Sequence, residues 1–159
     1  MKKVISLSLG LFLLAGIKVA GASENQVILR FETMVGNSGP FIGSRNPIRG
    51  IPAGGAAWVV LGGAEGRLTQ DGQLEVEVRG LVLVSTLMNP VANFRGLVSC
   101  LSIGDDGEVT TANLSTEDFP ADMNGNSRIE SSVKLPSPCF APLVFVTSPA
   151  GAWFATTGF

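Results

Sequence analysis

Two glutamates, Glu75 and Glu77, offer the clearest arrangement of side chains for catalysis. They stand two residues apart in an alternating segment, so both are expected on one face of a strand, about 7 Å apart at the backbone. Paired carboxylates near this separation can cleave glycosidic bonds. Arg67 and Arg79 are expected beside them, and ion pairs on a solvated sheet face account for the same residues. A carboxylate-dependent polysaccharide hydrolase is therefore an alternative to a solvated face.

The residue types that the chain lacks exclude several other kinds of catalytic site. It has no histidine and only two cysteines, which excludes Ser-His-Asp and Cys-His arrangements, histidine-ligated zinc and cysteine-only metal sites. The one lysine after residue 22 is Lys134, expected on the outward face of a strand, which disfavours a Ser-Lys dyad. We therefore expect no cofactor and a function other than catalysis.

Oxygen-bearing side chains at alternate positions, Asp122, Asn124 and Asn126, match the first ligands of an EF-hand or dockerin calcium loop. Ser127 stands where that loop has its turn glycine, and Val133 stands where it has its bidentate acid. A polar surface loop explains the same residues, so a calcium-stabilised domain is an alternative. A second acidic cluster at residues 105–108 is expected to be a turn.

The first 22 residues have the features of a cleaved signal peptide of bacterial type. Two lysines precede an apolar run over residues 4–17, which is shorter than the roughly 20 residues of a membrane span. Ala20-Gly21-Ala22 fits the small-residue rule for cleavage before Ser23. We expect one domain, residues 23–159, that is secreted, periplasmic or on the cell surface, without stable membrane insertion once the leader is removed.

Removal of the leader changes the charge of the chain. The loss of Lys2, Lys3 and Lys18 leaves 8 basic and 13 acidic side chains, a net charge of −5. Nucleic-acid binding requires a basic stripe, which the sequence lacks. We expect an extracellular or cell-surface ligand and no nucleic-acid partner.

Export also places Cys100 and Cys139 in an oxidising compartment, where an isolated pair of cysteines is most simply a disulfide. Each cysteine stands at the head of an apolar segment, and the two segments are expected to be neighbouring strands. The bridge would close a loop of about 40 residues, worth about 3–4 kcal/mol by the loop-entropy model. Two buried free thiols are the alternative.

Short alternating segments separated by glycine and proline predict an all-β fold. The chain has 20 Gly and 9 Pro and shows no helical periodicity after residue 22. We expect an antiparallel β-sandwich of about 7–9 strands with one disulfide, and a small β-barrel is the alternative. The expected strands are 26–35, 57–61, 65–69, 73–79, 81–84, 128–135, 143–148 and 152–158, together with a pair that meets at the turn of residues 105–107.

Three hairpin turns are expected to share one design, three residues that end in a left-handed glycine. At residues 70–72, a two-residue loop would place Glu75 opposite Leu68, whereas a three-residue loop places Leu74 there and keeps the charge off the apolar face. The turns at residues 105–107 and 149–151 likewise predict the cross-strand pairs Ile103–Val109 and Val146–Phe154.

A long segment without periodicity, residues 36–55, is a candidate functional loop. It is rich in Gly, Pro, Ser and Asn and carries Phe41, Ile42 and Ile48. Ordered loops of this length are uncommon in small domains and often bind ligands. A strap that crosses between two sheets explains the same composition.

Several sequence words resemble a group of exported bacterial all-β proteins. They are Phe94-Arg95 with Val98-Ser99-Cys100, residues 135–139 (LPSPC), residues 144–149 (VFVTSP) and residues 151–155 (GAWFA). The resemblance covers about Ile48 to Gly158 and implies a shared fold with the same cysteine pair, but it assigns no catalytic residue. A second pattern, Ala64-x-Gly66-x-Leu68 followed by Leu74-x-Val76, resembles chordin-type (CHRD) β-domains, although that family usually carries histidines.

These features together predict a secreted, non-catalytic β-sandwich that serves as a binding, cell-surface or structural module. An exposed apolar patch formed by Phe41, Ile42 and Ile48 would favour binding. Two acids that face each other across a cleft, one of them desolvated, would favour the hydrolase.

Overall fold

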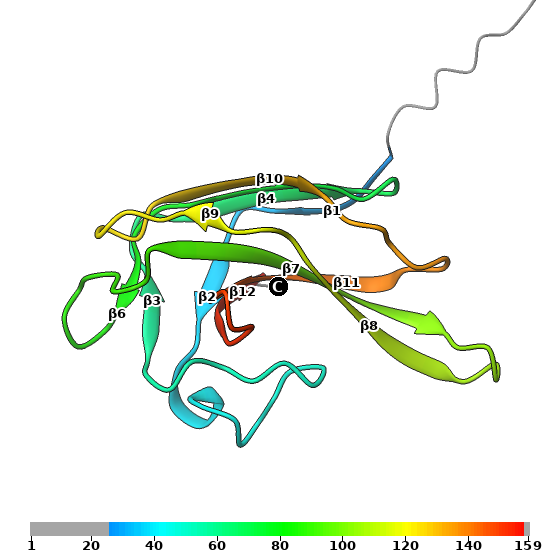
Figure 1. The fold of residues 1–159 in the computed structure, drawn as a ribbon, viewed down its shortest axis with the longest axis horizontal. Helices are drawn as coiled ribbons and strands as arrows, with labels where there is room; N and C mark the ends of the chain where they lie inside the picture. The colour runs from blue at the N-terminus through cyan, green and yellow to red at the C-terminus, as the bar shows by residue number, and fades with distance from the viewer. Residues whose placement is uncertain (1–25, 158–159) are drawn as a thin grey trace, which may run out of the picture.

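The structure, a computed structural model, describes residues 26–157, and within them the chain is built almost entirely of β-strands (Figure 1). Eight strands have five or more residues, four have two or three, and one 3-10 turn, η1 (Gly39–Phe41), is the only helical element of this described part. The predicted all-β class is confirmed. The strands are β1 (Val27–Phe31), β2 (Met34–Gly36), β3 (Trp58–Val60), β4 (Ala64–Thr69), β5 (Gln73–Val78), β6 (Leu81–Leu83), β7 (Asn93–Ile103), β8 (Val109–Ser115), β9 (Phe119–Pro120), β10 (Ser127–Ser132), β11 (Phe140–Thr147) and β12 (Trp153–Thr157).

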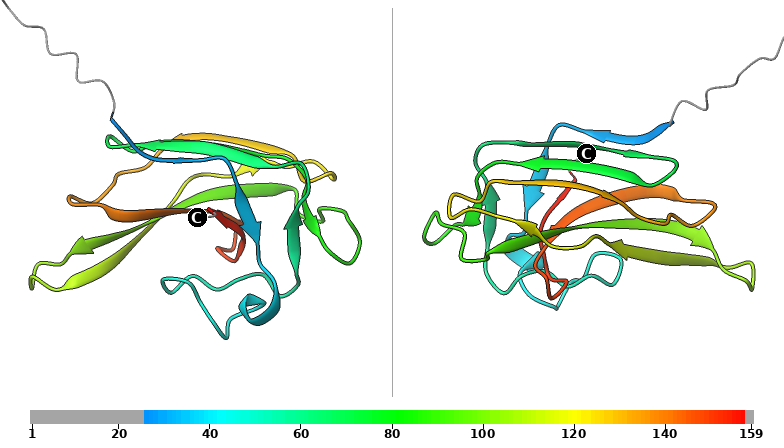
Figure 2. Two further views of the ribbon diagram at one scale, coloured as in Figure 1. Left: turned by 180° about the vertical axis from the view of Figure 1, so that it is seen from behind. Right: turned by 45° about the horizontal axis from the view of Figure 1, so that its top comes forward.

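The strands form two packed layers. Sheet A has the order β1-β4-β5-β10, and sheet B has the order β2-β12-β11-β7-β8, with β9 beside one end of β7. Figures 1 and 2 show sheet A lying over one face of sheet B, while the β3–β6 pair stands at one end of the two layers. All of the named pairings are antiparallel and both sheets are open. The predicted sandwich is therefore the architecture, rather than a small barrel.

The main core lies between the two sheets. Leu68 and Leu74 of sheet A are fully buried against Phe94 and Val98 of β7. At one end of this core Trp58 stacks on Phe154, with ring centroids 4.0 Å apart. Burial of these large apolar side chains supplies the main driving force for folding.

A second apolar cluster covers the opposite face of sheet B. Leu97, Phe145 and Trp153 point away from sheet A and pack against Ile51 and Ala53 of the long loop after β2. Because both faces of sheet B are buried, β7 and β11 are apolar at successive positions instead of alternating.

Two of the three predicted hairpin registers are confirmed. Leu68 lies opposite Leu74 across the turn of residues 70–72, and Ile103 lies opposite Val109. Gly72 has a φ of 89°, and a Cβ there would lie 1.9 Å from the Val133 carbonyl oxygen, so only glycine fits.

The third register prediction was wrong. Val146 lies opposite Ala155 instead of Phe154, and Thr147 lies opposite Trp153. A β-bulge between Val146 and Thr147 shifts the pairing by one residue. Because Phe154 is the extra residue, Phe154 and Ala155 both enter the main core, while Trp153 belongs to the outer cluster.

The predicted first strand, residues 26–35, is in fact two strands. β1 belongs to sheet A and β2 to sheet B, and the chain crosses between the sheets at residues 32–33. Phe31 and Met34 flank the crossing and both enter the main core. The predicted strand 128–135 is also shorter, because β10 ends at Ser132.

The predicted leader, residues 1–22, lies outside the described residues. Among residues 26–157, the chain forms no helix of the length and apolar character that crossing a bilayer requires.

Candidate functional site

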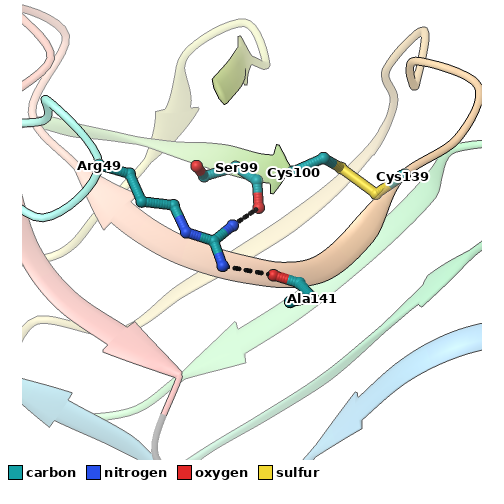
Figure 3. The surroundings of a disulfide bond; sticks show 5 residues. All are labelled: Arg49, Ser99, Cys100, Cys139 and Ala141. Carbon is teal, nitrogen blue, oxygen red and sulfur yellow. Dashed lines mark hydrogen bonds between the residues drawn. A yellow bond between two sulfur atoms is a disulfide. The ribbon is translucent and has the colours of Figure 1, made fainter. Parts of the chain in front are cut away.

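The predicted disulfide is confirmed. Cys100 on β7 is bonded to Cys139, which immediately precedes β11, and their Cα atoms are 5.1 Å apart (Figure 3). β7 and β11 are antiparallel neighbours, as the sequence predicted. The bond therefore fixes the start of β11 to the C-terminal half of β7, the longest strand in the described chain.

The candidate functional site is the long loop between β2 and β3, residues 37–57, which we call the covering loop. Figures 1 and 2 show it on the side of sheet B that faces away from sheet A. Ile51 and Ala53 are buried against Trp153 and Phe145. The loop thus serves as a cover for the outer face of sheet B, in addition to connecting two strands.

One arginine, Arg49, fixes the middle of the covering loop to two strands at once. Its Nη1 donates a hydrogen bond to the Ser99 carbonyl oxygen at 2.7 Å, and its Nη2 donates to the Ala141 carbonyl oxygen at 2.6 Å (Figure 3). Asn113 Nδ2 donates to the Arg49 carbonyl oxygen at 3.0 Å. Burial lowers the pKa of the Arg49 guanidinium, although an arginine stays protonated. The loop is therefore bonded to β7, β8 and β11.

The Ala141 carbonyl is available to Arg49 because β11 is irregular at that point. Phe140 lies opposite Leu101 and Leu143 lies opposite Ser99, so β11 has one extra residue between them. Ala141 has a φ of 42° in this bulge. Such a bulge leaves one residue outside the hydrogen-bond ladder between the strands. Here that residue is Ala141, and the Arg49 guanidinium binds its carbonyl oxygen.

A buried asparagine, Asn37, joins the two ends of the covering loop. Its side chain donates from Nδ2 to the Gly54 carbonyl oxygen and accepts from the Trp58 backbone N–H at Oδ1, both at 3.0 Å. Its own backbone N–H donates to the Phe154 carbonyl oxygen at 2.9 Å. Each polar group of a fully buried side chain is thereby used, which fixes the loop at its base.

The apolar patch predicted for this loop is present in part. Phe41 is 42% exposed, whereas Ile42 and Ile48 are half-buried. The Phe41 ring lies 6.5 Å from the ring of Trp153. One aromatic side chain is thus presented at the surface by a loop that is anchored underneath it.

The paired glutamates lie on the open outer face of sheet A. Glu75 is bonded to Arg67 at 2.5 Å and Glu77 to Arg79 at 2.5 Å, and both carboxylates are more than two-fifths exposed. The hydrogen bond from Arg67 lowers the pKa of the Glu75 carboxyl. A general acid requires a raised pKa in a desolvated pocket, so this geometry supports a solvated, ion-paired face and gives no support to hydrolysis.

The predicted calcium ligands lie in a tight surface turn. The Asp122 carboxylate accepts hydrogen bonds from the Asn126 backbone N–H and from Asn126 Nδ2, both at 2.9 Å. These bonds lower the pKa of the Asp122 carboxyl. Asn126 Oδ1 accepts from the Gly80 N–H at 3.1 Å, while Asn124 is exposed. The oxygens of Asp122 and Asn126 are therefore engaged within the chain, and the calcium prediction remains a prediction.

The remaining candidates occupy exposed positions. Lys134 is exposed just beyond β10, and the acidic cluster of residues 105–108 forms the β7–β8 turn. Within residues 26–157, no three His, Cys, Asp or Glu side chains are grouped so that they could hold a metal ion.

Sequence reasoning missed the two residues that anchor the covering loop. Arg49 is one of two charged residues between residues 37 and 57 and precedes a glycine, so the scarcity of charge in this segment was the available signal. Asn37 follows directly after a strand and carries no signal of its own. Both have partners that are distant in the sequence, and a pattern in one segment does not identify those.

No protein-family model, curated protein or solved structure matches this chain.

Proposed function

We propose that this protein is an exported, non-catalytic β-sandwich module that binds a ligand outside the cell or at the cell surface. The observation that carries the proposal is the construction of the covering loop. Arg49 and Asn37 anchor it through hydrogen bonds to partners on β7, β11 and β3, while Phe41 stays exposed above the buried residues. A loop ordered in advance loses little conformational entropy on binding, and an exposed aromatic ring supplies contact area.

The charged residues support the non-catalytic part of the proposal. Glu65, Glu75, Glu77 and Glu130 on the outer face of sheet A are paired with arginines. Such exposed pairs are the usual solution for a solvated sheet face. The polysaccharide hydrolase and the calcium-stabilised domain remain alternatives without a supporting contact in the described residues.

Export is tested first, by expression of the full chain in a bacterial host and N-terminal sequencing of the secreted or periplasmic product. A chain that begins at Ser23 supports the proposal. A chain that keeps residues 1–22 in the cytoplasm contradicts the exported location.

Binding is tested with arrays of polysaccharides and peptides. The protein is compared with a Phe41→Ser/Ile42→Ser variant and with a matched control, Leu61→Ser, which changes an exposed leucine outside the covering loop. We expect retention on an array component that falls about tenfold or more in the double variant and is unchanged in the control, as for an aromatic contact residue. Release of reducing sugar that is lost in Glu75→Gln would overturn the proposal in favour of the hydrolase.

A further inference from the structure

The edge strand β8 differs from every other edge of the two sheets. Edge strands expose unpaired N–H and C=O groups, and proteins usually protect them with charges, proline, bulges or short length. β10 carries Arg128 and Glu130, β1 carries Arg30 and a bulge, and β2 has three residues. β8 has seven residues in regular register with β7 and contains neither a charged residue nor proline. Among the described edges it is the one without such protection.

The hydrogen-bond pattern shows which backbone groups of β8 are free. Gly104 N–H donates to the Glu108 carbonyl and Thr116 N–H donates to the Gly96 carbonyl, so the even-numbered residues of β8 face β7. The backbone groups of the odd-numbered residues therefore face away from the sheet. None of them makes a backbone hydrogen bond elsewhere within residues 26–157, and all four residues are exposed. These four are Val109, Thr111, Asn113 and Ser115.

Acidic side chains flank this edge at both ends. Asp105, Asp106 and Glu108 lie in the turn before β8 and make no ion pair within the described residues. Glu117 and Asp118 follow β8, and Asp118 is paired with Arg95. The edge is thus an uncharged ladder of about 20 Å between two acidic ends.

The charges disfavour a second copy of this chain as the occupant. An antiparallel pair of β8 strands would place the acidic turn of one copy beside Glu117 of the other, which has no ion pair within the described residues. A parallel pair would place the two acidic turns side by side. Like charges that lie opposite each other on neighbouring strands are destabilising. Charge repulsion therefore disfavours both kinds of dimer.

We propose that β8 is a docking edge for an extended peptide segment whose uncharged middle is flanked by basic residues. The segment adds a strand to sheet B, bonds to the free groups of the four odd-numbered residues and places its basic ends beside the acidic ends of the edge. The exposed Val109 and Ile103 lie opposite each other beside the turn, so a β-branched apolar residue fits there. This assignment goes beyond the proposed function, because it names a second surface and the class of partner that this surface binds.

The probe is a labelled peptide of about seven alternating valines and threonines with lysines at both ends, matched to the length of β8. Its twin carries glutamates in place of the lysines. We expect the full processed chain to bind the lysine peptide at least about tenfold more tightly than the glutamate peptide, with an affinity that falls as salt is added. Absence of binding, or equal binding of the two peptides, overturns the proposal.

The decisive variant is Thr111→Pro, compared with Thr111→Val at the same position. The Thr111 N–H faces away from β7, so proline removes one docking donor and leaves the ladder to β7 intact. We expect about tenfold weaker binding in the proline variant and binding within about twofold in the valine variant. Equal binding in both variants would overturn the edge assignment.

Hydrogen exchange gives a second readout that does not depend on a variant folding. The amides of the four odd-numbered residues are expected to exchange rapidly in the free protein and slowly with the lysine peptide, while the amides of Thr110 and Ala112 are protected in both states. Unchanged exchange at the four amides would contradict docking at β8.

A variant with Asp105→Asn, Asp106→Asn and Glu108→Gln is expected to bind the lysine peptide several-fold more weakly and with less dependence on salt.

Two further outcomes separate this inference from its alternatives. A dimer that is seen by sedimentation and lost in Thr111→Pro would assign the edge to a second copy and overturn the peptide partner. Loss of peptide binding together with Phe41-dependent array binding would refute the β8 edge alone and leave the proposed function in place.

Discussion

Arg49 and Ala141 both have left-handed backbone conformations, with φ of 51° and 42°, and the Arg49 guanidinium donates to the Ala141 carbonyl oxygen. Left-handed conformations are costly for residues other than glycine and persist where the surroundings hold them in place. Here each residue contributes one half of a contact between the covering loop and the bulge of β11. The loop and the bulge are therefore expected to depend on each other for stability.

Substitution Arg49→Ala should break this contact. It leaves the carbonyl oxygens of Ser99 and Ala141 without their donor, so we expect the free energy of unfolding to fall by about 1–3 kcal/mol. Urea denaturation of the oxidised protein measures the change. Arg45→Ala, an exposed position in the same loop, serves as the control and should change stability by less than about 0.5 kcal/mol. Equal effects of the two substitutions would show that Arg49 does not anchor the loop.

Substitution Asn37→Ala should release the base of the covering loop. The Gly54 carbonyl and the Trp58 N–H would each lose one of two partners, since Gly43 N–H still donates to Gly54 and the Asn37 backbone carbonyl still accepts from Trp58. We therefore expect a loss of about 1–2 kcal/mol from the two side-chain hydrogen bonds. Thermal unfolding measures the loss. Asn46→Ala removes an exposed side-chain hydrogen bond to the Pro40 carbonyl and should cost less than about 1 kcal/mol. A stable Asn37→Ala protein with unchanged Tm would contradict the anchoring role.

The hairpins could be predicted because the signals that determine them are local. Placing Leu68 opposite Leu74 followed from side-chain parity and from a glycine that alone fits its turn. The bulge between Trp153 and Ala155 has no comparable signal, since a one-residue shift there exchanges one aromatic residue for another and leaves the sequence pattern unchanged.

The position of the covering loop could not be predicted, because it depends on contacts far apart in the sequence. Successive apolar residues in β7 and β11 indicate that both faces of sheet B need cover, but they do not identify the segment that supplies it. Arg49 lies 92 residues from Ala141. The β8 edge, in contrast, has a local signal that was missed, an uncharged run of seven residues between two acidic clusters.

Removal of the disulfide should destabilise the fold through the unfolded chain. Cys100 and Cys139 are 39 residues apart in the sequence, and the loop-entropy model gives a loss of about 3–4 kcal/mol for the Cys100→Ser/Cys139→Ser variant. Urea denaturation of the double variant measures the difference. Addition of reductant should lower the midpoint of the native protein and leave that of the double variant unchanged. A midpoint insensitive to both treatments would show that the bridge does not contribute to stability.

The ion pair between Arg67 and Glu75 should make stability depend on pH. Because Arg67 lowers the pKa of Glu75 in the folded state, the pair contributes fully above the ordinary glutamate pKa of 4.5. The contribution is lost as pH falls through the lowered pKa. Glu75→Gln should therefore reduce Tm slightly at pH 7 and less at pH 3, with a smaller effect in high salt. Glu32→Gln, which changes an exposed residue without an ion pair in the described chain, is the control. A larger effect of Glu75→Gln at pH 3 than at pH 7 would reverse the sign and refute the argument.

The Asp122 turn provides the test of calcium binding. Extracellular calcium sites have dissociation constants of about 10⁻⁴–10⁻³ M, so about 5 mM calcium would stabilise a bound domain by about 1–2 kcal/mol. Because the Asp122 carboxylate already accepts two hydrogen bonds from Asn126, we expect calcium and chelator to leave the Tm unchanged. Asp122→Ala should lower the Tm at pH 7, where the carboxylate is ionised, and less at a pH below its lowered pKa. A rise in Tm with calcium that disappears in Asn124→Ala would show instead that the turn opens to bind the ion, because Asn124 is exposed and would be recruited as a ligand.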